Sequence, residues 1–121
     1  MSFAFGKDCV DCLLRTKKVV VISKTGCPYC VEVKQTLASY KINKDCLAVL
    51  EIDTRSDGDE IQCYMEQLTG ARTVPRVFID GVCIGGGDET VAAHESGELK
   101  ELLLKAGAIV VDEYNTTCTV L

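Results

Sequence analysis

The sequence has no tryptophan, two prolines, one histidine and no apolar run long enough to span a membrane. Acidic residues outnumber basic ones, 18 to 13, and the net charge of −5 argues against general nucleic-acid binding, which needs a basic surface. Residues 1–11 lack a charged segment followed by a long apolar one, so we expect no secretory signal and a reducing compartment, the cytoplasm. The 121 residues are 47% apolar, which suits one domain with its own core.

Cysteine, by contrast, is abundant. Eight thiols stand at positions 9, 12, 27, 30, 46, 63, 83 and 118. A secreted disulfide framework is one interpretation of that number, but the apolar content is sufficient for folding without crosslinks. Two pairs of cysteines, Cys9 with Cys12 and Cys27 with Cys30, have Cys-x-x-Cys spacing, which indicates redox chemistry or metal binding.

Apolar and turn-forming residues predict four strands. Residues 19–22 are a continuous β-branched run, typical of a strand buried on both faces, and residues 48–52 form a second strand. Residues 76–79 and 82–84 flank Asp80-Gly81, a strong hairpin signal. With helices between them, these strands predict an α/β fold around one small mixed sheet.

Helical periodicity appears in four segments. Residues 3–15 are weakly helical, with Phe5, Cys9, Cys12 and Leu13 near one face, and residues 28–40 carry a clear apolar stripe. Residues 89–106 form the last predicted helix, interrupted at Gly97.

The third predicted helix begins after Asp57 and stops at Gly70. Glu60 stands three residues after Asp57, which predicts a capping box. The inner face of this third helix is predicted to hold Ile61, Tyr64, Met65 and Leu68.

The second Cys-x-x-Cys pair, Cys27-Pro28-Tyr29-Cys30, falls where a predicted strand ends and a helix begins. Proline suits the first helical position, so Cys27 becomes the N-cap, where free backbone N–H groups and the helix dipole stabilise a thiolate. Lys24 adds a nearby positive charge. Cys30 lies one turn further along the apolar stripe and is expected to be buried and less acidic. This arrangement predicts one attacking and one resolving thiol.

The segment 24–30, Lys-Thr-Gly-Cys-Pro-Tyr-Cys, resembles the glutaredoxin active site. Residues 60–72, 73–75 and 85–86 also match that family in order and spacing, and the resemblance covers roughly residues 5–108. Thioredoxins share the fold but carry a tryptophan before the active site, which this chain lacks. The resemblance implies a thioredoxin-like fold with a four-stranded mixed sheet over residues 1–108, and we expect residues 109–121 to be a flexible tail.

The resemblance also implies a glutathione-binding groove with a cis peptide bond before Pro75. Backbone pairing at Val74, helix N–H groups at Gly87 and Asp88, an acidic contact to the ammonium, and Lys24 and Gln62 at the glycyl carboxylate would hold the tripeptide. The implied contacts are Lys24, Tyr29, Gln62, Thr73, Val74, Pro75, Gly86, Gly87, Asp88 and Glu89.

The chain departs from the family at the start of its last predicted helix. The family often has Cys or Asn where Gly87 stands, and Ser-Asp or Asp-Asp where Asp88-Glu89 stands. Glu89 is one methylene longer than the usual Asp, which weakens the transfer of its ammonium contact. Asp88 is also a candidate for an ordinary N-cap.

The activity implied by the resemblance is glutathione-dependent reduction of disulfides. Cys27 attacks glutathionylated substrates, a second glutathione regenerates it, and Cys30 resolves protein disulfides. We expect a monomer with no bound cofactor or metal, with glutathione as co-substrate and glutathionylated proteins and protein disulfides as partners.

Other interpretations of the cysteines remain open. Cys9, Cys12, Cys27 and Cys30 have a spacing close to that of a zinc ribbon, although no hairpin signal lies between the pairs. Some glutaredoxins hold an iron–sulfur cluster between two subunits, which Pro28 disfavours. Cys9 and Cys12 are either a second redox pair or ordinary helix residues. For the single histidine, His94, we expect a surface role.

The last four residues, Cys118-Thr119-Val120-Leu121, fit two short motifs. They match a prenylation box, in which terminal leucine favours geranylgeranyl, and a PDZ ligand. The preceding acidic residues Asp112-Glu113 provide no basic second anchor, so either role implies only a weak membrane or PDZ contact. A frayed tail is the third interpretation.

Overall fold

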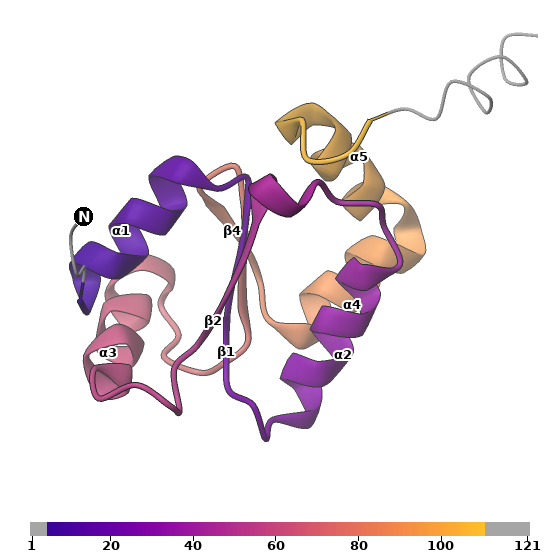
Figure 1. The fold of residues 1–121 in the computed structure, drawn as a ribbon. Coiled ribbons are helices and arrows are strands. Elements are labelled where there is room, and N and C mark those ends of the chain that lie inside the picture. Colours follow the sequence, from indigo (N-terminus) through magenta and orange to yellow (C-terminus); the bar gives the residue numbers. More distant parts are fainter. Residues whose placement is uncertain (1–4, 111–121) are drawn as a thin grey trace, which may run out of the picture.

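The computed structural model describes residues 5–110, which form a central sheet with helices on both sides (Figure 1). Its elements follow in the order α1 (Lys7–Thr16), β1 (Val19–Ser23), α2 (Pro28–Ala38), the short 3-10 helix η1 (Lys44–Cys46), β2 (Leu47–Glu51), α3 (Gly58–Thr69), β3 (Arg76–Ile79), β4 (Val82–Gly85), α4 (Gly87–Ser96) and α5 (Glu98–Ala106). None of the described helices is both long and apolar enough to cross a bilayer.

The four strands lie in the order β2-β1-β3-β4, which confirms the predicted mixed sheet. β1 pairs parallel with β2 and antiparallel with β3, and all five of its residues are buried. The turn between β3 and β4 has positive φ at Asp80 (52°) and Gly81 (82°), as a tight hairpin requires. The central strand β1 therefore leads directly from the middle of the core to the Cys27 turn.

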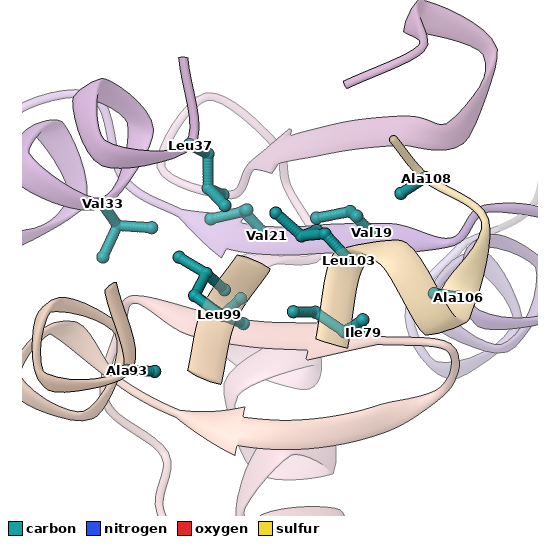
Figure 2. Close-up of a cluster of buried hydrophobic side chains, with 11 residues drawn as sticks. Val19, Val21, Val33, Leu37, Ile79, Ala93, Leu99, Leu103, Ala106 and Ala108 are labelled. Atoms are coloured by element: carbon teal, nitrogen blue, oxygen red, sulfur yellow. The ribbon is translucent and has the colours of Figure 1, made fainter. Parts of the chain in front are cut away.

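The alternation of side chains along β1 divides the core into two layers. Val19 and Val21 pack with α2 and α5 through residues such as Leu37 and Leu103 (Figure 2). Val20 and Ile22 face the other way, into a second cluster of buried side chains from α1 and α3, namely Val10, Ile61 and Met65. Figure 1 accordingly shows α1 and α3 on one side of the sheet and α2 and α4 on the other.

Two predicted helices differ from the structure in their exposed faces. The buried residue of α1 is Val10, whereas Phe5 precedes the helix and is 53% exposed. Leu68, predicted on the inner face of α3, is 45% exposed because that face ends with Met65. The last predicted helix is two helices, since Gly97 adopts a left-handed conformation (φ 88°) that ends α4 and precedes α5.

The predicted capping box of α3 is wrong. Asp57 is the N-cap residue, but its side chain makes no cap hydrogen bond. Its carboxylate instead accepts the backbone N–H of Gly6 at 2.7 Å and two hydrogen bonds from Arg55 at 2.8 and 2.9 Å. Glu60 accepts the backbone N–H of Lys7 at 3.4 Å. The backbone N–H groups of Gly6 and Lys7 thus bind the carboxylates of Asp57 and Glu60 and connect the start of α1 to the start of α3.

Candidate active site

The Cys27 turn joins the end of β1 to the start of α2. Pro28 occupies the first turn of the helix, and Cys27 is its N-cap with extended backbone angles (φ −89°, ψ 119°). The sulfur of Cys27 accepts the backbone N–H of Cys30 at 3.4 Å. The structure therefore places Cys27 at the helix position that the sequence predicts.

The surroundings of Cys27 favour its thiolate. Partial burial by itself raises the pKa of the thiol, but the N–H groups of Cys30 and Tyr29, the Cys30 thiol and the charge of Lys24 outweigh it. The net result is a Cys27 pKa below the ordinary value. A half-buried thiolate at a helix N-terminus is a nucleophile suited to disulfide exchange.

Cys30 has the opposite environment. Its side chain is fully buried, and burial raises the pKa of the Cys30 thiol, with the neighbouring Cys27 contributing in the same direction. Its sulfur accepts the backbone N–H of Lys24 at 3.4 Å. One acidic and one sheltered thiol, three residues apart, can form a disulfide that the outer thiol initiates.

A first cavity of about 200 Å³ lies beside the Cys27 turn. The Val74–Pro75 peptide bond is cis, as the resemblance implies. The lining residues are Tyr29, Thr73, Val74, Pro75, Arg76, Gly86, Gly87, Asp88 and Glu89. Eight of the ten predicted glutathione contacts therefore lie around one cavity.

The start of α4 borders this cavity. Gly86 is the N-cap, and Glu89 accepts its backbone N–H at 2.7 Å, a bond that also lowers the pKa of Glu89. The alternative role of Asp88 as N-cap is therefore wrong, because Asp88 is the second helical residue and its exposed side chain is not part of the cap. One oxygen of Glu89 is occupied by the helix, and Asp88 lies free at the cavity rim.

A second cavity of about 190 Å³ contains the remaining two predicted contacts, Lys24 and Gln62. Its other lining residues are Ile52, Asp53, Arg55, Ser56, Gly58 and Asp59. Gln62 donates a side-chain hydrogen bond to the carbonyl of Arg72 at 3.0 Å, which orients its amide. In the chain, Cys27 stands between Lys24 of the second cavity and Tyr29 of the first.

Sequence reasoning missed two residues of the site. Arg76 lines the first cavity, where its guanidinium donates to the carbonyl of Pro75 at 3.0 Å. Asp53 lines the second cavity and accepts hydrogen bonds from Thr25. The signal for Asp53 was available, because it follows β2 as Thr25 follows β1, and neighbouring parallel strands end at the same edge of a sheet.

The remaining cysteines and the histidine lie elsewhere. Cys9 and Cys12 are on α1, which packs on the opposite face of the sheet from α2, so the two Cys-x-x-Cys pairs do not form one site. Within residues 5–110, no three His, Cys, Asp or Glu side chains come close enough to hold a metal ion. His94 is exposed, and its Nδ1 lies 2.7 Å from the Tyr40 hydroxyl, which joins α4 to the end of α2.

Comparison with known proteins gives one consistent family. A family model described as glutaredoxin matches residues 19–84, more than half of the chain. A glutaredoxin from Ricinus communis is 50% identical over 101 residues, covering 80% of this chain and 92% of the relative. Human glutaredoxin-1 is 44% identical over 100 residues, covering 83% and 94%.

Solved structures agree with this result. The crystal structure of a buckwheat glutaredoxin–glutathione complex superposes with a TM-score of 0.78 at 40% identity, covering 84% of this chain and 90% of that one. Oxidized glutaredoxin 2 from Chlamydomonas reinhardtii gives a TM-score of 0.76 at 44% identity, covering 83% and 92%. The chain belongs to the glutaredoxin family and is a glutathione-dependent thiol–disulfide oxidoreductase.

Proposed function

We propose that Cys27 is the nucleophile and that its first reaction is removal of glutathione from mixed disulfides. The Cys27 thiolate attacks the glutathione sulfur, the disulfide bond breaks, and the substrate leaves as a thiolate that takes a proton. A second glutathione, as its thiolate, then attacks the glutathione sulfur on Cys27. Oxidised glutathione leaves, and the Cys27 thiolate is restored.

The two cavities beside the Cys27 turn support a place for the tripeptide. Val74 is half-buried in the wall of the first cavity, where its backbone suits pairing with the cysteinyl backbone of glutathione. The first turn of α4 offers N–H groups to the γ-glutamyl carboxylate, and Asp88 lies at the rim for its ammonium. Lys24 is charged to meet the glycyl carboxylate in the second cavity, where Gln62 also lies.

For protein disulfides, we propose that Cys30 completes the reaction. After Cys27 has attacked, the Cys30 thiolate displaces the second substrate thiol and a Cys27–Cys30 disulfide forms. Two molecules of glutathione then reduce that disulfide. The raised pKa of the buried Cys30 keeps its thiol protonated before a mixed disulfide forms on Cys27.

The observation that carries this proposal is the Cys27 thiol at the N-cap of α2, with its pKa lowered, next to a cavity lined by the cis Val74–Pro75 segment. The direct test is a glutathione-coupled reduction assay on a small glutathione mixed disulfide. Turnover that disappears in Cys27→Ser supports the assignment. Turnover that survives in Cys27→Ser would refute it.

We further propose that the protein works in the cytoplasm as a monomer without a bound cluster. The proposed reaction begins from a reduced Cys27, and a glutathione-reduced compartment maintains that state. Cell fractionation and sedimentation of the purified protein test the first two points. A brown colour after anaerobic purification would contradict the third.

The C-terminal motif stays a prediction. Cys118-Thr119-Val120-Leu121 lies outside the described residues, as do Asp112 and Glu113. Expression in a prenylating cell tests it, because lipidation would add one isoprenoid to the mass and remove the last three residues.

A further inference from the structure

The carboxylate of Asp53 binds the turn that precedes the active-site cysteine. The backbone N–H of Thr25 donates to its two oxygens, at 3.1 and 3.2 Å, and the Thr25 hydroxyl donates to one of them at 2.5 Å. Thr25 stands two residues before Cys27. Both hydrogen-bond donors of Thr25, the backbone N–H and the hydroxyl, therefore bind one side chain, which belongs to the segment after β2.

The topology of the sheet explains the contact. β1 and β2 are parallel and in register to their last pair, Ser23 and Glu51, so the segments that follow them leave the same edge side by side. The backbone N–H of Ile52 donates to the carbonyl of Ser23 at 2.9 Å and continues the ladder by one bond. Asp53 then reaches Thr25, where the ladder stops.

The turn has few other anchors. The Cys27 N–H donates to the Lys24 carbonyl at 3.3 Å, and the Lys24 N–H donates to the buried Cys30 sulfur. Gly26 is exposed, and a Cβ placed on it would meet nothing within 4 Å, so the middle of the turn borders open space on that side. Within the described residues, the other hydrogen bonds of residues 24–27 stay inside residues 23–31. Asp53 is therefore the link from this turn to the rest of the sheet edge.

The charge of Asp53 makes its role specific. The hydrogen bonds from Thr25 lower the pKa of Asp53, and the charge of Lys24 lowers it further, so the carboxylate is ionised at neutral pH. The same Lys24 charge lowers the pKa of Cys27. A negative charge disfavours the ionisation of a nearby thiol, so the charge of Asp53 cannot by itself promote thiolate formation. Any benefit it gives to the reaction has to come from the geometry it imposes on the turn.

We propose that Asp53 is a positioning residue of the disulfide exchange, which holds Thr25 so that Cys27 stays at the helix N-cap and Lys24 stays beside it. It acts as a hydrogen-bond acceptor and not through its charge. This inference rests on the proposed role of Cys27 as nucleophile.

The test compares variants that separate the acceptor from the charge. Asp53→Asn keeps one acceptor oxygen and removes the charge, whereas Asp53→Ala removes both. Thr25→Ser keeps the hydroxyl donor and Thr25→Val removes it from an exposed position. Asp80→Asn is the matched control, because Asp80 is an exposed aspartate at the far hairpin whose partner is Lys18 at 4.0 Å.

Two quantities are measured for each variant in the reduced full chain. The first is the alkylation rate of Cys27 by iodoacetamide against pH, and the second is kcat and KM for a small glutathione mixed disulfide. We expect Asp53→Ala to raise the alkylation midpoint and to lower kcat/KM by about tenfold, because a displaced reactive group reacts more slowly. Thr25→Val keeps the backbone N–H bonds and should change both quantities in the same direction by a smaller factor. Asp53→Asn, Thr25→Ser and Asp80→Asn should stay within about twofold of the unmodified protein.

The double variant Asp53→Ala/Thr25→Val should be no worse than Asp53→Ala alone, because Asp53→Ala already removes the acceptor of the Thr25 hydroxyl. Equal loss in Asp53→Asn and Asp53→Ala would overturn the proposal in favour of a charge effect. An unchanged Asp53→Ala would overturn it outright. Alkylation of Cys27 needs no turnover, so a failure of the proposed nucleophile would appear separately, as activity that survives Cys27→Ser.

Discussion

The backbone N–H of Cys30 donates to the sulfur of Cys27 at 3.4 Å, while the Cys30 sulfur is fully buried behind it. This bond helps to stabilise the outer sulfur as an anion, whereas burial keeps the inner sulfur from water. Their pKa values move in opposite directions for this reason, downward for Cys27 and upward for Cys30. The two cysteines are chemically different before any substrate arrives.

The first prediction concerns the division of labour between these thiols. Cys27→Ser should abolish both reduction of a glutathione mixed disulfide and reduction of a protein disulfide. Cys30→Ser should keep the first reaction within about threefold, or about 0.7 kcal/mol of transition-state stabilisation, and lose the second. Glutathione can resolve the Cys27 mixed disulfide by itself, so the inner thiol is needed only for dithiol reduction.

Both coupled assays on both variants measure this difference. Cys46→Ser is a suitable control, since Cys46 is the last residue of the 3-10 helix η1 and lines neither cavity. If Cys30→Ser stops deglutathionylation, the monothiol mechanism is wrong.

The second prediction concerns the charge of Lys24. Because the Cys27 pKa is lowered, the thiol should titrate below the value of about 8.5 for a free cysteine, and activity should fall as the pH drops through that lower pKa. Lys24→Met should raise the midpoint, because an opposite charge nearby is lost. Iodoacetamide alkylation rates measured against pH give the midpoint for each protein.

High salt provides the control for this prediction. It should raise the midpoint of the unmodified protein toward that of Lys24→Met and leave the variant nearly unchanged, because half-exposed charges are screened. A midpoint of the unmodified protein at the free-cysteine value would contradict the assignment of Cys27 as a stabilised thiolate.

The third prediction concerns Cys9 and Cys12. Both lie on α1, on the opposite face of the sheet from α2, and neither lines a cavity beside the Cys27 turn. Replacing both with serine should leave glutathione-dependent turnover nearly unchanged. A loss of tenfold or more, about 1.4 kcal/mol, would show that they belong to the site.

The fourth prediction concerns the acid stability of the α1–α3 junction. Hydrogen bonds from Arg55 lower the pKa of the buried Asp57 carboxyl to about 2, against an ordinary 3.8. Because the pKa of Asp57 is lower in the folded protein than in the unfolded chain, its carboxylate stabilises the fold at pH values above the unfolded-state pKa. This stabilisation is lost as the pH falls from about 4 toward 2. The contribution is about 2 kcal/mol at neutral pH.

Urea unfolding of the reduced protein between pH 2 and pH 6 measures this contribution. Asp57→Asn keeps an acceptor for the Gly6 N–H but loses the ion pair, so its free energy of unfolding should be lower at neutral pH and flatter below pH 4. The exposed Asp80→Asn is the control and should follow the unmodified protein. Parallel curves for Asp57→Asn and the unmodified protein would contradict the assigned pKa.

Local patterns in the sequence were sufficient for most of the fold. The β-branched run 19–22, the Asp80-Gly81 pair and Gly70 each specify a local conformation through sterics, and the structure has them as β1, the hairpin and the end of α3. The predicted position of Cys27 at a helix start rests on the same kind of argument, because Pro28 is suited to the first helical position.

Long-range partners explain where sequence reasoning failed. Asp57 and Glu60 have the spacing of a capping box, but α1 brings the N–H groups of Gly6 and Lys7 to them instead. Phe5 and Leu68 are apolar and were predicted to face inward, yet the core cluster ends before it reaches them. A local pattern cannot reveal a competitor that arrives from fifty residues away.

The sequence by itself determined the redox motif, its place at a helix N-terminus and the order of strands and helices, because these depend on contacts within a few residues. Only the tertiary structure decided that Arg76 joins the cavity and that Asp53 holds Thr25. Each of these contacts depends on the relative placement of different strands and helices. That placement follows from the parallel register of β1 with β2 and from the layers of the core, which no short stretch of sequence contains.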